Sequence, residues 1–174
     1  GCAAMSRVAG GRVVLDRAEL ARLLAAERAA GRVVVLANGC FDLLHAGHVR
    51  YLRGAAAEGD VLVVAVNSDE SVRRNKGPDR PLQPESDRAE VLAAIGCVDY
   101  VTVFAEPTAD AILRDLRPHV QAKGTDWTAD AVPEAATVRE IGARVAIVGD
   151  EKTRSSSDLL AKARGGRRPG ATGC

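Results

Sequence analysis

The sequence has 174 residues, 47% hydrophobic and 27% charged, a composition typical of one compact α/β or α+β domain. The formal net charge is only +1 and aromatic residues make up 3%, so we expect neither attraction to polyanions nor stacking of bases, and no nucleic-acid partner. No apolar run approaches the ~20 residues that cross a bilayer and the N-terminus lacks a secretory pattern, so we expect no membrane contact and a cytoplasmic location.

Buried strands alternate with amphipathic helices along the chain. After a helix at about residues 16–30, continuous apolar runs predict five strands, at residues 32–38, 60–67, 99–104, 119–124 and 143–149. Apolar residues at i, i+3 and i+4 predict further helices at residues 48–59, 86–96, 108–117, 133–142 and 155–164. This alternation predicts one Rossmann-like α/β domain over residues 13–164, with a five-stranded parallel sheet and helices on both faces. Residues 1–12 are expected to be disordered and residues 165–174 to form a flexible tail.

The first predicted strand leads into "NGCFDLLHAGH", which holds two of the three histidines, His45 and His48. Open parallel sheets bind ligands beyond the carboxyl ends of their strands, so chemistry is expected here. A helix starting near residue 44 or 45 would put both imidazoles on its first turn, where backbone N–H groups and the dipole favour an anion. Asn38 and Gly39 end the strand, and Gly39 is expected to allow a sharp turn close to a ligand. A phosphate site is predicted; the alternatives are surface decoration or an accidental metal site.

Polar stretches also follow the second, fourth and fifth predicted strands. Lys76 and Arg80 lie in "NSDESVRRNKGPDR", expected to be a loop that closes over phosphates, or else a solvated charged loop. Lys123 ends a buried strand, where a cation needs a partner, and Gly124 lets the backbone approach a nucleotide. "SSSDLL" suits either a phosphate site or an ordinary N-cap. Arg88 is poorly placed for the dipole of its helix, which favours a phosphate contact.

Neither GxGxxG nor GxxxxGK[ST] occurs, so a dinucleotide dehydrogenase and a P-loop NTPase are disfavoured. The motifs instead resemble the HxGH nucleotidyltransferase superfamily: "HAGH" is followed in order by "NSDESVRRNKGPDRPLQPESDRAEVL", "AKGTDW" and "SSSDLL", and the resemblance spans about residues 33–162. The sequences of these motifs resemble those of the adenylyltransferases of ADP-heptose synthesis, which occur fused to a sugar kinase or as separate chains.

The resemblance implies a single nucleotidyltransferase domain that transfers AMP from ATP to D-glycero-D-manno-heptose 1-phosphate, giving ADP-heptose for lipopolysaccharide and pyrophosphate. It also implies magnesium carried by ATP, a homodimer, and work beside a separate sugar kinase. Two alternatives stay open: a cytidylyltransferase acting on glycerol 3-phosphate or a related alcohol phosphate, and a non-catalytic nucleotide-binding subunit. The hydrogen-bonding side chains Asn75, Asp79 and Gln83 near the cations favour a sugar phosphate over glycerol phosphate.

The same resemblance implies roles for individual residues. His45, His48 and Lys76 are the implied catalytic residues. Nucleotide and phosphate binding is implied for Asn38, Gly39, Cys40, Phe41, Lys123, Gly124, Asp126, Trp127, Ser155, Ser156 and Ser157. Substrate binding is implied for Asp42, Asn67, Lys76, Arg80 and Arg88. No metal ligand is identified: Asp42 either orders the turn or assists magnesium, and Trp127 has the alternative role of filling the core.

Overall fold

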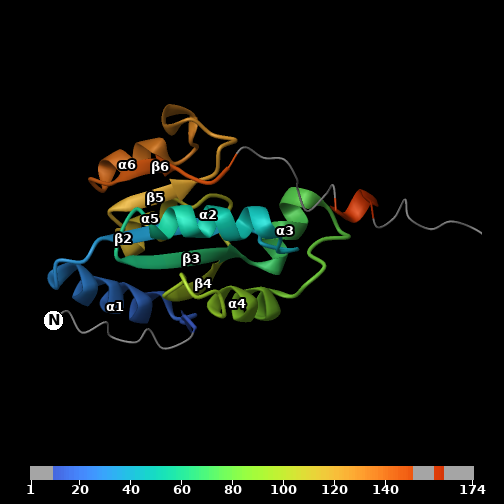
Figure 1. Ribbon diagram of the computed structural model, residues 1–174, viewed down its shortest axis with the longest axis horizontal. Helices are drawn as coiled ribbons and strands as arrows, with labels where there is room; N and C mark the ends of the chain where they lie inside the picture. Colours follow the sequence, from blue (N-terminus) through green and yellow to red (C-terminus); the bar gives the residue numbers. More distant parts are fainter. Residues whose placement is uncertain (1–9, 151–158, 163–174) are drawn as a thin grey trace, which may run out of the picture.

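The structure, a computed structural model, describes residues 10–150 and 159–162. Its strands are β1 (Arg12–Val13), β2 (Val34–Gly39), β3 (Val61–Asn67), β4 (Tyr100–Phe104), β5 (Val120–Lys123) and β6 (Arg144–Ile147). Its helices are α1 (Arg17–Ala29), α2 (Ala46–Ala56), α3 (Asp69–Lys76), α4 (Glu85–Ala93), α5 (Asp110–Leu116) and α6 (Ala135–Glu140), with a 3-10 turn η1 (Ala129–Ala131). The six strands form one parallel sheet in the order β1-β4-β3-β2-β5-β6 (Figure 1).

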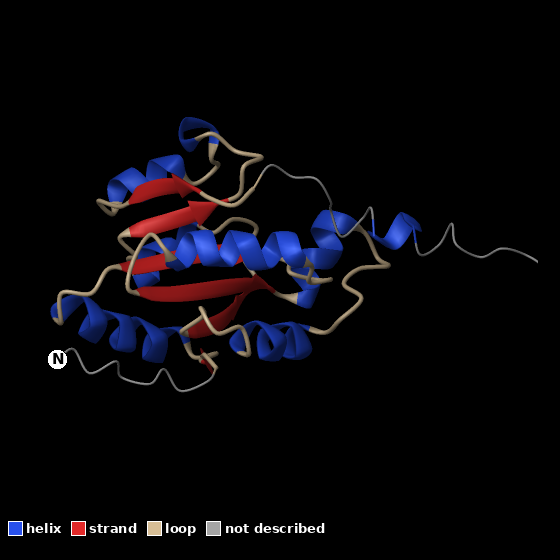
Figure 2. Cartoon of the chain, viewed as in Figure 1, coloured by secondary structure: helices blue, strands red, loops and turns tan. Residues whose placement is uncertain are grey.

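Helices flank the sheet on both faces (Figure 2). Side chains alternate along a strand, so Val35 and Ala37 of β2 join one core with α2 and α4, whereas Val34 and Leu36 join another with α1 and α5. All seven residues of β3 are buried, as continuous apolar character predicts for a central parallel strand. The predicted α/β class and two-faced helical cover are confirmed. Among the described residues, no helix is both long enough and apolar enough to cross a bilayer.

The sheet has one strand more than the five predicted. The additional strand, β1, contains two residues, which pair with Tyr100 and Val101 at the start of β4. The backbone N–H of Gly11 also donates to Ala93, so the paired part of the chain begins before residue 13. A two-residue strand carries no periodic apolar pattern, which is why the sequence did not reveal it.

Helix α3 was also missed, and Lys76 lies in its last turn rather than on a loop. Ser68 caps the helix by accepting a hydrogen bond from the Ser71 N–H at 3.2 Å. Acidic residues occupy the first turn and basic residues the last, which suits the helix dipole: Asp69, Glu70, Arg73, Arg74 and Lys76. Because Val72 is its only buried apolar residue, capping and charge define this helix instead of an apolar stripe.

The strand order creates a switch point between β2 and β5. From β2 the chain runs outward through β3 and β4, and it then returns to the other side of β2 to form β5 and β6. Such a reversal leaves a crevice at the carboxyl ends of the two central strands, where open α/β sheets bind ligands. Ala37 pairs with Ala122, so Asn38 and Lys123, each one residue further on, reach this edge together.

Candidate active site

The two histidines of "HAGH" begin helix α2. His45 is the N-cap residue, and its Nδ1 accepts a hydrogen bond from the Gly47 N–H at 3.1 Å. The Nδ1 of His48 accepts in turn from the His45 N–H at 3.3 Å. The ring centroids lie 4.0 Å apart, so the structure brings the two imidazoles together on the first turn.

These bonds decide which ring nitrogen carries the proton. A nitrogen that accepts a hydrogen bond is unprotonated, so the neutral rings of His45 and His48 both carry their proton on Nε2. The imidazoles therefore accept from two of the backbone N–H groups that were expected to bind an anion. In place of those groups, the two rings offer Nε2–H donors at the positive end of a helix of 11 residues. The arrangement suits an oxyanion such as a phosphate oxygen.

The glycine of the motif makes room for the first imidazole. A Cβ at Gly47 would lie 2.9 Å from Cε1 and 3.0 Å from Nδ1 of His45, so a larger residue here would force the ring to shift. Glycine at residue 47 therefore lets the His45 ring cap the helix without that shift.

The sharp turn before α2 lies at Phe41, which has φ of 48°, and not at Gly39 as expected. The Phe41 ring is buried and packs against His48 with ring centroids 5.5 Å apart. A Cβ at Gly39 would lie 3.2 Å from that ring, so the glycine accommodates Phe41. Phe41 therefore supports His48 from behind, at the cost of a left-handed backbone conformation.

Asp42 ties the histidine turn to the segment 77–84. Its side chain is fully buried: Oδ2 lies 2.5 Å from Nε of Arg80, and Oδ1 accepts from the backbone N–H groups of Leu82 at 2.8 Å and Gln83 at 3.1 Å. Burial by itself raises the pKa of Asp42, but these three donors outweigh it and hold the pKa below its ordinary value. Both carboxylate oxygens are engaged, so the structure favours the turn-ordering role over magnesium binding.

Arg88 corrects the expectation of a substrate contact. Its side chain is fully buried, so a phosphate cannot reach it. The guanidinium donates to the carbonyls of Cys40 (2.6 Å), Asn67 (2.8 Å) and Gln83 (3.0 Å), and to Asp69 Oδ1 at 2.8 Å. Arg88 lies near the positive end of the α4 dipole because its side chain points into the protein and bonds there, and not because it binds a phosphate.

Lys123 has the partner that its burial demands. Its Nζ lies 3.1 Å from Oε2 of the buried Glu134, just before α6, and 5.9 Å from the ring centroid of Trp127. Trp127 is 39% exposed and is therefore not a core residue. No atom of the described residues lies within 4 Å of a Cβ built on Gly124, beyond its chain neighbours, so that part of the structure leaves space beside the backbone there. Glu134 was missed because no local pattern marks it.

The remaining predicted residues spread over the same edge. The Asn38 Oδ1 accepts from the buried Gln121 at 3.4 Å, and Asn67 donates to Ser71 at 3.1 Å. Lys76 and Asp126 are exposed. Ser155, Ser156 and Ser157 lie outside the described residues. Among the residues that the structure describes, no group of three or more His, Cys, Asp or Glu side chains could hold a metal ion.

The sequence matches the family described as Cytidylyltransferase-like over residues 36–164, which is most of the chain. The chain belongs to this family of nucleotidyltransferases. The family prediction made from "HAGH" and its companion motifs is confirmed.

This nucleotidyltransferase is similar to curated proteins of two lengths. It is 50% identical to the D-beta-D-heptose 1-phosphate adenylyltransferase of Bordetella bronchiseptica, over 88% of this chain and 94% of that protein. It is 46% identical to the bifunctional protein HldE of Pelobacter propionicus over 84% of this chain, but it spans only 30% of that protein's length. A crystal structure of a lipopolysaccharide core biosynthesis protein from Thermoplasma volcanium covers 70% of this chain and 100% of its own, with a TM-score of 0.61 and 27% identity.

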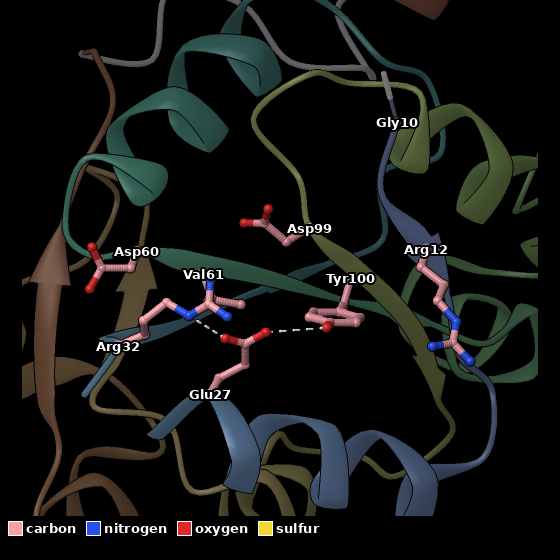
Figure 3. A pocket seen from close by; sticks show the side chains of 8 residues that line it. All are labelled: Gly10, Arg12, Glu27, Arg32, Asp60, Val61, Asp99 and Tyr100. Atoms are coloured by element: carbon pink, nitrogen blue, oxygen red, sulfur yellow. Dashed lines mark hydrogen bonds and ion pairs between the residues drawn. The ribbon is translucent and has the colours of Figure 1, made fainter. Parts of the chain in front are cut away.

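A cavity of about 490 Å³ lies at the opposite, amino edge of the sheet of this nucleotidyltransferase (Figure 3). Glu27 contacts Arg32 at 2.5 Å and Tyr100 at 3.5 Å across it. Asp60 and Asp99 also line it, and each accepts a hydrogen bond at 2.8 Å from a backbone N–H one residue before or after the first residue of a strand. These two carboxylates accept hydrogen bonds from backbone N–H groups near the starts of strands, so they have a structural role. The cavity is separate from the candidate active site.

Proposed function

We propose that the chain is an adenylyltransferase that transfers AMP from ATP to D-glycero-D-manno-heptose 1-phosphate, releasing pyrophosphate and giving ADP-heptose. The observation that carries the proposal is the pair of imidazoles, His45 and His48, whose Nδ1 atoms accept backbone hydrogen bonds at the switch point of the sheet. The choice of ATP and heptose phosphate is supported by the 50% identity to a relative of similar length that is named for this reaction.

The reaction forms a bond between a sugar-phosphate oxygen and the α-phosphorus of ATP, and it breaks the bond from that phosphorus to the pyrophosphate oxygen. The attacking phosphate has a second pKa of about 6 and is largely ionised at neutral pH, so it needs no general base. Catalysis then depends on in-line positioning and on donors placed where negative charge develops. The Nε2–H groups of His45 and His48 would donate to the phosphoryl oxygens as the bond to pyrophosphate lengthens.

Cations near the histidines would bind the remaining phosphate charge. Lys76, exposed at the end of α3, is assigned to the triphosphate, and Lys123 with Trp127 and Gly124 to the nucleotide side. Nucleotidyltransferases of this family typically use a divalent metal, and we propose magnesium, which would enter with ATP and neutralise its phosphates. Asp42 does not fit as a ligand because Arg80, Leu82 and Gln83 occupy its oxygens.

The partners follow from the substrates. The bifunctional relatives are more than three times as long as the matched segment. We propose that a sugar kinase supplies the sugar phosphate to this domain. A homodimer and a cytoplasmic location, where ATP is available, stay predictions. Sedimentation of the purified chain would test the first of these two.

A pyrophosphate-release assay tests the function. It would cross ATP, CTP, GTP and UTP with heptose 1-phosphate, other sugar 1-phosphates and glycerol 3-phosphate. We expect ATP with heptose 1-phosphate to exceed CTP with glycerol 3-phosphate by at least ~10²-fold in kcat/KM, because a site that hydrogen-bonds sugar hydroxyls leaves its polar groups unpaired with glycerol. Preference for the glycerol pair would replace the proposal by a cytidylyltransferase. Release from no pair would leave a nucleotide-binding subunit.

A further inference from the structure

We propose that Arg88 is a positioning residue for nucleotidyl transfer, a proposal that rests on the proposed function. The side chain does not touch substrate, because it is fully buried. Its guanidinium instead holds together three segments that form the active-site edge, at residues 40, 67–69 and 83, and so sets the distance between the donors that must act on one triphosphate.

The four bonds of Arg88 hold three segments. Nη1 donates to the carbonyl of Cys40 at 2.6 Å, in the turn that leads to the histidines, and to the carbonyl of Asn67 at 2.8 Å, at the end of β3. Nη2 donates at 2.8 Å to Asp69, the first residue of α3, whose last turn carries Lys76. Nε donates at 3.0 Å to the carbonyl of Gln83, at the end of the segment that carries Arg80.

The peptide groups of Gln83 are held from two sides. The N–H of Gln83 donates to Asp42 at 3.1 Å, and its carbonyl accepts from Arg88. Asp42 and Cys40 both belong to the turn before α2, so two buried charged side chains, Asp42 and Arg88, fix the segment 77–84 against the histidine turn. A shift of the turn before α2 or of the segment 77–84 would change the distance between the imidazoles and Arg80.

Only a guanidinium can make this set of contacts. Its planar fork presents five N–H donors in fixed directions, whereas a lysine ammonium is a compact charge with three donors at one point. Lysine at residue 88 would keep the positive charge while losing the simultaneous bonds to Cys40, Gln83 and Asp69. The substitution therefore separates geometry from charge.

The test compares Arg88→Lys with Arg28→Lys. Arg28 is a matched control: its Nη1 also donates to backbone carbonyls, of Leu116 at 2.7 Å and Arg117 at 3.3 Å, but it joins α1 to the end of α5, away from the site. At a temperature where both variants are fully folded by circular dichroism, we expect Arg88→Lys to lower kcat by about 10²-fold, the scale of a 1 Å misplacement. Arg28→Lys should keep kcat within about 3-fold of the unsubstituted chain, as expected for a site outside the machinery. Normal kcat in Arg88→Lys, or equal losses in both, would overturn the proposal.

A second variant covers the case in which Arg88→Lys does not fold. Asp69→Asn removes the charge of the Nη2 partner and leaves the three carbonyl bonds of Arg88 in place. We expect kcat to fall by about 3- to 10-fold while KM for ATP changes less, because the start of α3 shifts but the side chains that bind ATP remain. An unchanged kcat in Asp69→Asn would also overturn the proposal.

Imidazole ¹⁵N NMR separates failure of this proposal from failure of the proposed function. It reports the tautomers of His45 and His48 without any turnover. We expect the folded Arg88→Lys chain to lose the single Nε2–H form at His45 or His48, and Arg28→Lys to keep it. If the unsubstituted chain transfers no nucleotide, the function fails while this spectrum still decides the role of Arg88; identical spectra in both variants would count against it.

Discussion

The two edges of the sheet use the same residue types in different ways. At the carboxyl edge Asp42, Arg88 and Lys123 are exposed by 8% or less, and each is held by partners from other segments. At the amino edge Asp60 and Glu27 line an open cavity, and the Arg32 side chain that pairs with Glu27 is 56% exposed. A buried charge must be paired, so its partners are fixed in place, whereas water can replace an exposed partner at little cost. In this protein the buried charges, and not the cavity, lie at the edge that carries the candidate active site.

The histidines provide the largest expected contrast. His45→Ala and His48→Ala should each lower kcat by roughly 10²-fold or more, because each removes a preorganised donor from developing charge. The third histidine is the matched control: His119 Nδ1 accepts from the Val34 N–H at 3.0 Å, at the amino edge. His119→Ala should leave kcat within about 3-fold, as for residues away from the chemistry. Steady-state kinetics on folded protein checks this, and an equal loss in His119→Ala would erase the contrast.

Aspartates at the two edges give the next contrast. Asp42→Asn places an amide where a buried carboxylate accepts three hydrogen bonds, so at least one buried donor loses its acceptor, at about 1–3 kcal/mol. We expect that loss in the free energy of unfolding and roughly 10-fold lower kcat/KM, since the segment 77–84 is released. Asp60→Asn, where the side chain is exposed and accepts from one N–H, should cost less than about 1 kcal/mol. Urea unfolding with kinetics measures both; similar costs would show that burial is not the deciding factor.

One glutamate at each edge tests the contribution of its ion pair to stability. Glu134→Gln leaves Lys123 buried without a counter-charge and should cost about 3–5 kcal/mol of unfolding free energy and raise KM for the nucleotide. Glu27→Gln should cost under about 1 kcal/mol, because its partner Arg32 is mostly exposed. Chemical unfolding of the two variants at one pH measures the difference. A larger loss in Glu27→Gln would reverse the ranking of the two edges.

Glu106 lies at the carboxyl edge without being buried, so it tests whether the edge or the burial of a charge decides the cost of its loss. We expect the smallest change in stability here. It follows β4 at the carboxyl edge, but its side chain is 34% exposed. The bond to Arg17 outweighs burial and lowers the pKa of Glu106 to about 2. A depressed pKa stabilises the folded state above the ordinary value near 4.5, and this contribution is lost as the pH falls from 4.5 to about 2.

Solvent screening limits the Glu106 contribution to about 1 kcal/mol. In Glu106→Gln, the free energy of unfolding should therefore fall less steeply between pH 5 and pH 2 than in the unsubstituted chain. Thermal or urea unfolding at several pH values tests this. The carboxylate of Asp42, whose pKa is also lowered, remains in the variant and should still contribute a decline. Identical pH profiles would mean that the Arg17 bond carries no stability.

Local patterns predicted the parts of the molecule that depend on near neighbours. The long strands and amphipathic helices were predictable because an apolar period of two or 3.6 residues is written in consecutive positions. Helix α3 and strand β1 escaped this reading, since one is defined by capping and charge and the other has two residues. The histidine pair was predictable for the same reason as the helices, because residues three positions apart lie on the same face of a helix.

The sequence by itself determined the α/β class and, through "HAGH" and its companion motifs, the nucleotidyltransferase family, and it predicted a site at the switch point of the sheet. Only the tertiary structure decided what the charged residues do. Arg88 reaches Cys40 across 48 positions and Asp42 reaches Leu82 across 40, so no local pattern records either contact. Whether a charged side chain faces a ligand or a backbone carbonyl depends on which segments the fold brings beside it, and burial then makes that pairing obligatory.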